Sequence, residues 1–208
     1  MAAGGDAPRT IVHLVRHGEV HNPDRILYGR LPGYRLSARG RAQAAATAAS
    51  FAGHDVAALY VSPMLRTRQT AEPIAEVTGC AQRVRGDLIE AGNDFEGLHV
   101  RGPRSDLWHP RHWPLLRRPG VPSWGEPYTA IADRIGAVIA EARAAAAGRE
   151  AVLVTHQLCV VAAARRARGL RLAHNPARRQ CELASVTSLL FTGERLDGVR
   201  YAEPAAGV

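Results

Sequence analysis

The chain has 208 residues, of which 46% are hydrophobic and 22% are charged, close to the shares of ordinary globular proteins. This composition excludes a disordered tail, a fibrous repeat and a disulfide scaffold. Its 27 basic residues, all arginine, outnumber 19 acidic ones and give a net charge of +8. Such a charge suits a nucleic acid, an anionic membrane or a small anionic substrate, so the positions of the arginines must distinguish these partners.

Neither a targeting segment nor a membrane-spanning segment is predicted. Residues 1–10 lack the apolar stretch of a signal peptide, and no run approaches the roughly 18 apolar residues of a membrane helix. Cys80, Cys159 and Cys181 are too widely spaced for a zinc motif or a disulfide framework. We therefore expect a cytoplasmic protein with one domain over residues 1–208.

Short apolar strands alternate with Ala-rich helices along the chain. Runs rich in β-branched residues are typical of buried strands, and the predicted strands span 11–15, 56–61, 82–85, 151–155, 183–191 and 199–201. Helix signals such as a capping Ser, an early Pro and a closing Gly place helices at 37–51, 63–78, 128–147 and 158–168. This alternation predicts a three-layer α/β/α sandwich with a mainly parallel sheet.

An irregular insertion at about 91–127 interrupts this alternation with Gly, Pro, Trp and charged residues. Segments of this length without periodicity are usually functional or mobile. One interpretation is a lid that contacts the leaving group of a substrate. For at least two of the tryptophans we favour packing in a small apolar cluster instead. The residues concerned are Trp108, Trp113 and Trp124, with Arg101, Arg104, Arg111, Arg117 and Arg118 around them.

Basic and imidazole side chains follow two of the predicted strands. Arg16 and His17 come directly after the first strand, and His156 follows the strand 151–155. Ligands of such sheets bind at the carboxyl ends of the strands, so we expect both histidines at one edge. A neutral imidazole is a competent nucleophile near pH 7, and a guanidinium matches the geometry of phosphate oxygens.

A third arginine is predicted at the same edge. Arg66 lies in the first turn of the helix that follows the second strand, and a helix N-terminus itself favours an anion. Arg68 would point elsewhere on that helix, into solvent. Most other arginines, Arg178 and Arg179 among them, are interpreted as solvated surface residues.

Four segments, taken in order, resemble the histidine phosphatase superfamily, the phosphoglycerate-mutase-like proteins. They are Arg16-His17-Gly18-Glu19, the stretch 36–44 (similar to LTxxGxxQA), the stretch 62–71 (similar to SxxxRxxQTA) and Thr155-His156. The match spans about residues 10–168. It implies a phosphoglycerate-mutase-like fold, in the branch that contains cofactor-dependent mutases and many small phosphatases.

The resemblance also implies roles for these residues. His17 would attack phosphorus and carry a phosphohistidine, while Arg16, Arg66 and His156 would surround the phosphoryl oxygens. Neither a metal nor another cofactor is expected. Asn22 resembles the family's Asn that follows the signature, which implies a hydrogen bond to the phosphoryl group. Gln157 departs from the family, which often has Gly there. The Gln157 amide either reaches the phosphate or the substrate, or only begins the helix.

The proton donor is less well marked than the nucleophile. The stretch 88–97 is similar to the family pattern LxExxxGxxEG, which makes Glu90 the first choice. The spacing from Glu90 to Glu96 is one residue shorter than in the family, and Asn93 and Asp94 occupy the region of its Gly. Asp94 and Glu96 are therefore weaker alternatives.

The function implied by the resemblance is phosphatase action on a small phosphorylated metabolite, with inorganic phosphate as product. A phosphoglycerate mutase is the alternative, although mutases that use a bisphosphate cofactor are typically longer than 208 residues. Nucleic-acid binding is less favoured, because aromatic residues are only 5% and no nucleic-acid motif is present. The oligomeric state is left open, with a homodimer as one alternative.

Overall fold

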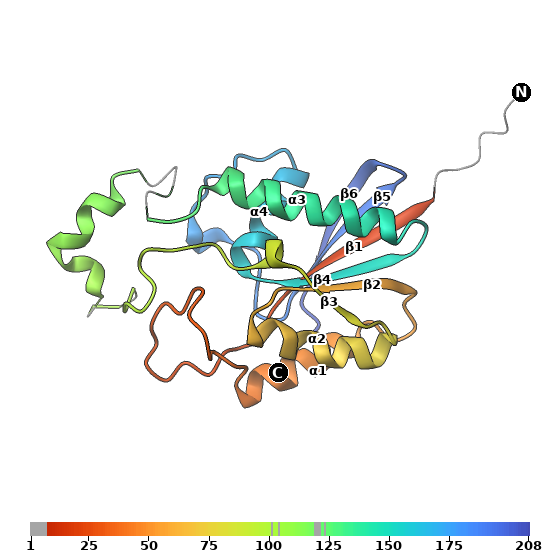
Figure 1. Ribbon diagram of the computed structural model, residues 1–208, viewed down its shortest axis with the longest axis horizontal. Coiled ribbons are helices and arrows are strands. Elements are labelled where there is room, and N and C mark those ends of the chain that lie inside the picture. Colours follow the sequence, from red (N-terminus) through yellow and green to blue (C-terminus); the bar gives the residue numbers. More distant parts are fainter. Residues whose placement is uncertain (1–7, 101, 104, 119–121, 123) are drawn as a thin grey trace, which may run out of the picture.

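The computed structural model describes residues 8–208 except 101, 104, 119–121 and 123. The expectations for the first seven residues, for Arg101 and for Arg104 therefore lie outside the described residues. A six-stranded sheet forms the centre, in the order β3-β2-β4-β1-β5-β6 (Figure 1). The strands are β1 (Arg9–Arg16), β2 (Val56–Val61), β3 (Gln82–Val84), β4 (Glu150–Thr155), β5 (Val186–Thr192) and β6 (Arg195–Ala202).

The sheet is mainly parallel, as predicted. β3, β2, β4 and β1 run parallel to one another, whereas β5 pairs antiparallel with β1 and forms a hairpin with β6. β4 is buried from Ala151 to Thr155, because helices cover both faces of the sheet at its centre. This burial explains why β4 is a continuous apolar run rather than an alternating one.

Two helices pack on each face of the sheet, which confirms the three-layer sandwich (Figure 1). Helices α1 (Ala38–Ala49) and α2 (Leu65–Thr78) cover one face, and α3 (Tyr128–Ala145) and α4 (Gln157–Ala167) cover the other. Ser37 begins α1 by accepting a hydrogen bond from the Gly40 amide. Gly79 ends α2 in the left-handed region, with φ of 68°.

Some element boundaries differ from the sequence predictions. α2 begins at Leu65 rather than Pro63, because Met64 is extended and caps the helix. β5 begins at Val186 rather than 183, because Ala184 has a φ of 57°, which interrupts an extended strand. β6 is longer than the predicted 199–201, since this edge strand is polar and half-exposed and lacks an apolar run.

The insertion extends away from the sheet, and its described residues include two short 3₁₀ helices (Figure 1). These are Asp106–Trp108 and Pro110–Leu116. Trp108 and Trp113 are 71% and 58% exposed, so the expected packing of at least two tryptophans in an apolar cluster is wrong. Among the described residues, Trp124 is the one tryptophan whose ring stacks on another aromatic ring, that of buried Phe95.

No helix within the described ranges has both the length and the apolar character needed to cross a membrane.

Candidate active site

The ends of β1 and β4 bring the two predicted histidines together. Arg16 and Thr155 are register partners at the ends of these neighbouring strands, and the His17 amide donates to the Thr155 carbonyl at 3.1 Å. His156 follows Thr155 directly, so the imidazole rings of His17 and His156 lie 5.2 Å apart between centroids. Both rings are buried.

The hydrogen bond of His17 fixes which ring nitrogen is free. Its Nδ1 lies 2.8 Å from the Gly18 carbonyl oxygen, and a carbonyl only accepts, so Nδ1 carries the proton. Burial lowers the pKa of His17 well below its usual value of 6.5, and the charges of Arg66 and Arg16 lower it further. His17 is therefore neutral at neutral pH, with the lone pair on Nε2.

Arg66 is fully buried beside the histidines. Its Nη2 donates to the Gly29 carbonyl at 2.7 Å and to Nδ1 of His156 at 3.2 Å, and its guanidinium lies 4.9 Å from the centre of the Tyr28 ring. A guanidinium only donates, so the proton of neutral His156 is on Nε2, which donates to Ser62 Oγ at 2.8 Å.

The arginines keep hydrogen-bonding capacity for a ligand. Arg16 donates through Nη1 to the Cys181 carbonyl at 2.7 Å. Its Nε, and both Nε and Nη1 of Arg66, are buried without an acceptor among the residues that the structure describes. A buried donor left unpaired costs about 1–3 kcal/mol. The oxygens of an anion bound between these arginines would satisfy such groups.

Glu90 is the carboxylate next to the histidines. Its Oε2 lies 3.9 Å from His156 Nδ1, and its Oε1 accepts from the Ala91 amide at 2.9 Å. Burial raises the pKa of Glu90, although that amide and the charges of Arg66 and Arg16 act in the opposite direction. A raised pKa keeps part of the carboxyl protonated closer to neutral pH, as a proton donor requires.

The two alternative carboxylates lie in other surroundings. Asp94 is exposed. Glu96 accepts a hydrogen bond at 2.8 Å from the backbone amide of Arg30, so it supports the turn that presents the Gly29 carbonyl to Arg66. Of these three carboxylates, Glu90 is the one that lies next to His156, and its role as proton donor remains a prediction.

Asn22 and Gln157 differ in their relation to the site. Asn22 donates to the Ile26 carbonyl within its own loop at 2.9 Å, so its observed bond is local. Gln157 begins α4, and its Nε2 lies 3.5 Å from the Cys181 carbonyl that also holds Arg16. Gln157 therefore adjoins the arginine, whereas the placement of Asn22 on phosphate remains a prediction.

Arg179 was expected in solvent, and the structure corrects this. It is half-buried, and it donates to His174 at 2.9 Å and to the Gln157 side chain at 3.2 Å. Burial lowers its pKa, and the charges of Glu90 and Arg16 also reach it. No sequence motif surrounds Arg179, so only the fold reveals that it lies beside the site.

The turn that contains Tyr28 also belongs to the site. The sequence left open whether it faces the pocket or only connects elements. The Tyr28 ring contacts both Arg66 and His17, and the carbonyl of Gly29 holds Arg66. The turn therefore positions the buried guanidinium.

His17, Glu90 and His156 also bring three metal-ligand atoms within 4.8 Å of one another. A cation there would face the positive charges of Arg66 and Arg16, which lower the pKa of both imidazoles. The local charge thus favours an anion. The expectation that no metal takes part remains a prediction.

Known proteins resemble this chain over nearly its whole length. Residues 12–204 match the histidine phosphatase superfamily (branch 1). The uncharacterized protein Rv0525 of Mycobacterium tuberculosis is 52% identical over 198 residues, which cover 95% of this chain and 98% of that protein.

Two solved structures extend the likeness to three dimensions. The complex of mycobacterial glucosyl-3-phosphoglycerate phosphatase Rv2419c with inorganic phosphate has 26% identity and a TM-score of 0.74, and covers 96% of this chain and 100% of that chain. Phosphoglycerate mutase from Bacillus anthracis str. Sterne has 18% identity and a TM-score of 0.73, covering 97% of this chain and 96% of that chain. The second likeness concerns the fold alone.

Proposed function

Because this chain belongs to the histidine phosphatase superfamily, we propose that it hydrolyses small phosphomonoesters through a phosphohistidine at His17. One observation carries this proposal. A buried, neutral His17 has its Nε2 lone pair free beside Arg16 and Arg66, whose buried N–H groups lack acceptors within the described chain. This arrangement combines a nucleophile with an anion site.

In the first step, Nε2 of His17 attacks phosphorus in line with the ester oxygen. Arg16 and Arg66 donate to the remaining oxygens, where charge is spread in the transition state. The negative charge of the bound phosphoryl group favours a second proton on His156, at Nδ1, and His156 then donates to an oxygen as well. The P–O bond to the leaving group breaks as the N–P bond forms. The carboxyl of Glu90 gives its proton to the departing oxygen, so an alcohol leaves and a carboxylate remains.

In the second step, water takes the place of the alcohol. The Glu90 carboxylate accepts a proton from water while the water oxygen attacks phosphorus. The N–P bond breaks, its electron pair returns to Nε2 of His17, and inorganic phosphate is released. The protein is then back in its starting state.

Arg179 bears on the class of substrate. It adds a third guanidinium to those of Arg16 and Arg66 and is connected to Arg16 through Gln157 and the Cys181 carbonyl. A substrate with a second anionic group near its phosphate would complement this charge. The related phosphatase named for glucosyl-3-phosphoglycerate supports a phosphorylated organic acid as the first class to examine.

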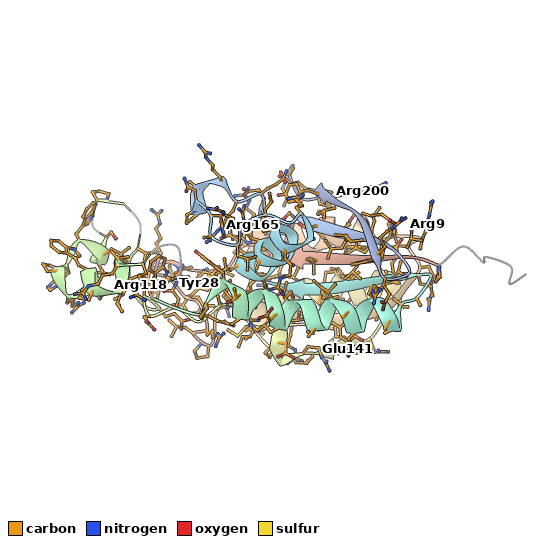
Figure 2. The ribbon with its side chains drawn as sticks, turned by 90° about the horizontal axis from the view of Figure 1, so that it is seen from above. Arg9, Tyr28, Arg118, Glu141, Arg165 and Arg200 are labelled. Atoms are coloured by element: carbon orange, nitrogen blue, oxygen red, sulfur yellow. The ribbon has the colours of Figure 1, made fainter. Side chains whose placement is uncertain are left out.

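The arginines that Figure 2 labels do not gather in one place. The labelled side chains of Arg118, Arg165 and Arg9 lie spread along the long axis of the molecule (Figure 2). A nucleic-acid groove instead combines clustered cations with aromatic side chains. We therefore expect a small phosphorylated partner.

The function is tested with two substrates. Wild-type protein should release phosphate from p-nitrophenyl phosphate, and His17→Asn should reduce the rate at least about 10³-fold, because it removes the nucleophile. Unchanged turnover in His17→Asn would disprove the mechanism. With 3-phosphoglycerate and a bisphosphate primer, release of free phosphate supports a phosphatase, whereas accumulation of 2-phosphoglycerate would show a mutase.

A further inference from the structure

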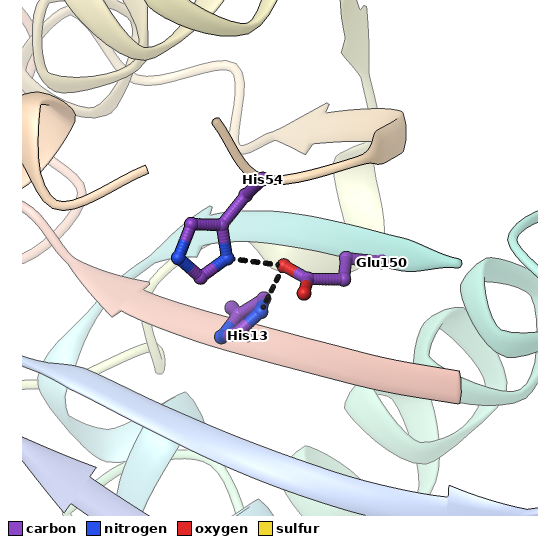
Figure 3. A group of neighbouring side chains, drawn as sticks. All are labelled: His13, His54 and Glu150. Carbon is purple, nitrogen blue, oxygen red and sulfur yellow. Dashed lines mark hydrogen bonds and ion pairs between the residues drawn. The ribbon is translucent and has the colours of Figure 1, made fainter. Parts of the chain in front are cut away.

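Two histidines and a glutamate meet on the sheet away from the candidate active site (Figure 3). His13 lies within β1, Glu150 is the first residue of β4, and His54 precedes β2. A strand rises about 3.3 Å per residue, so His13 is about 13 Å from His17 along the chain. The cluster takes no part in the phosphoryl-transfer steps described above.

The three side chains converge on one point. His13 Nε2 lies 3.0 Å and His54 Nδ1 lies 2.7 Å from the same oxygen of Glu150, Oε2. One ligand atom from each residue lies within 4.8 Å of the other two. In a tetrahedral zinc site with bonds of about 2.0–2.2 Å, neighbouring ligand atoms are about 3.3 Å apart. The two nitrogen–oxygen distances are slightly shorter than this spacing, and the two nitrogens lie within 4.8 Å of each other, so small shifts of the side chains would convert this triangle into one face of a tetrahedron.

Neighbouring residues hold His13 in the orientation that a metal ligand needs. Its second nitrogen, Nδ1, lies 2.8 Å from Ser188 Oγ on β5. Histidines that bind a metal usually engage the other ring nitrogen in such a hydrogen bond, which fixes the ring and its tautomer. The Phe51 ring contacts both imidazoles edge-on, with centroids 5.2 Å from His13 and 5.7 Å from His54.

Solvent reaches the cluster from one side. The side chains of His13, Glu150 and His54 are 8%, 19% and 40% exposed, so burial decreases from the sheet toward the loop. An ion could enter beside His54 and keep a water as a fourth ligand. Two imidazoles and one carboxylate form a donor set that suits zinc and its neighbours among the divalent transition metals.

We propose that His13, His54 and Glu150 form a binding site for one divalent transition-metal ion of the zinc class. The ion would connect β1, β4 and the segment before β2, so its expected effect is on stability. The competing explanation is a hydrogen-bonded cluster that never binds metal, and the experiment below distinguishes the two.

The protons of the cluster balance on metal binding. Without metal, the imidazole nitrogens that face Glu150 carry hydrogens and donate to its carboxylate. On metal binding, each facing nitrogen gives up its proton to water and the opposite ring nitrogen gains one, so the imidazole stays neutral and the freed lone pair binds the ion. For His13 that nitrogen is Nδ1, which then donates to Ser188 Oγ as the hydroxyl rotates. The ion is neither oxidised nor reduced.

The test uses tag-free full-length protein, treated with EDTA and then titrated with Co²⁺ as a visible probe of coordination. Wild type should bind one Co²⁺ per chain with the intense visible bands of a four-coordinate site, and Zn²⁺ should abolish them. His54→Ala and Glu150→Gln should each weaken Co²⁺ binding more than tenfold. Zinc should also raise the Tm of wild type and not that of His54→Ala.

Two control variants locate the ion. His21→Ala removes an exposed histidine outside the cluster and should bind Co²⁺ like wild type. His156→Asn disrupts the other group of potential ligands, and it should lose phosphatase activity while keeping the cobalt bands. His54→Ala should keep its activity, which also shows that the variant folds. The proposal would be overturned if folded wild type showed no cobalt bands or if both ligand variants kept them. Loss of the bands in His156→Asn would overturn it as well.

Discussion

At the scale of single residues, the chemistry of the candidate site depends on which side chains carry a proton. Burial next to arginines lowers the pKa of His17 and of His156, whereas burial raises the pKa of Glu90. The shifts move a base and an acid toward each other on the pH scale. A neutral nucleophile and a protonated donor can therefore coexist at mildly acidic to neutral pH.

Glu90→Gln tests the proton donor through its dependence on the leaving group. We expect the variant to slow alcohol release in a single turnover by about 10²–10⁴-fold for an alkyl phosphate. The loss should be smaller for p-nitrophenyl phosphate, because p-nitrophenolate departs without a proton. The decline of the wild-type rate as pH rises through the raised pKa of Glu90 should disappear in the variant. An equal loss with both esters would assign the donor elsewhere.

The sequence motifs predicted the main residues of the candidate site, but they did not predict several residues that lie beside that site. Arg16, His17, Arg66 and His156 stand at strand ends or in a first helical turn, and parallel strands bring such positions to one edge. Arg179 reaches that edge from an irregular segment. The position of Arg179 depends on tertiary packing, which a local sequence pattern does not predict. The contacts of His13 also depend on tertiary packing.

At the scale of elements, the turn at residues 28–30 contacts the buried guanidinium of Arg66. Gly29 has a φ of 36°, and a Cβ there would lie 2.2 Å from Glu96 Oε1. Its carbonyl accepts the hydrogen bond from Arg66. A side chain at this position would be strained at this φ and would displace the Glu96 side chain that holds the turn, so glycine here helps to fix the position of the guanidinium.

Gly29→Ala should therefore impair catalysis more than folding. We expect kcat/KM for p-nitrophenyl phosphate to fall at least about tenfold, since a small misplacement of a positioned group can cost up to about 10²-fold. Gly33→Ala is the matched control, because Gly33 also has a positive φ (83°) but no atom within 4 Å of an added Cβ. It should lose about 1–3 kcal/mol of stability from backbone strain alone. Similar kcat/KM in both variants would refute the coupling.

Buried elements were the easiest to predict. β2 spans Val56–Val61, as the apolar run indicated, because its residues lack competing polar roles. The edge strand β6 was found only in part, since an exposed strand keeps polar residues and its pairing with β5 depends on the hairpin. The exposed tryptophans of the insertion follow from its distance to the sheet, which composition does not reveal.

At the scale of the whole molecule, the two buried histidines of the candidate site make the stability of the fold depend on pH. The lowered pKa values mean that His17 and His156 are neutral in the folded state at a pH where the unfolded chain protonates them. Below about 6.5, the unfolded state therefore binds more protons, and stability decreases as pH falls. The raised pKa of Glu90 contributes with the opposite sign.

Unfolding between pH 7 and pH 5 measures this effect. The free energy of unfolding of wild type should fall with decreasing pH, in one cooperative transition if the chain is a single domain. His17→Asn removes one of the two titrating groups, so its slope should be smaller by up to about 1.4 kcal/mol per pH unit. Denaturant titrations at fixed pH give these slopes. Identical slopes would show that His17 is not held neutral by the fold.

The most direct test of the central claim is detection of the phosphohistidine itself. Wild type mixed with p-nitrophenyl phosphate is quenched under alkaline denaturing conditions, which preserve a phosphorus–nitrogen bond, and its peptides are analysed by mass spectrometry. We expect one phosphoryl group on Nε2 of His17, formed and lost at rates that match turnover, and none in His17→Asn. Turnover without phosphorylated His17, or a phosphoryl group on His156 instead, would contradict the proposed mechanism.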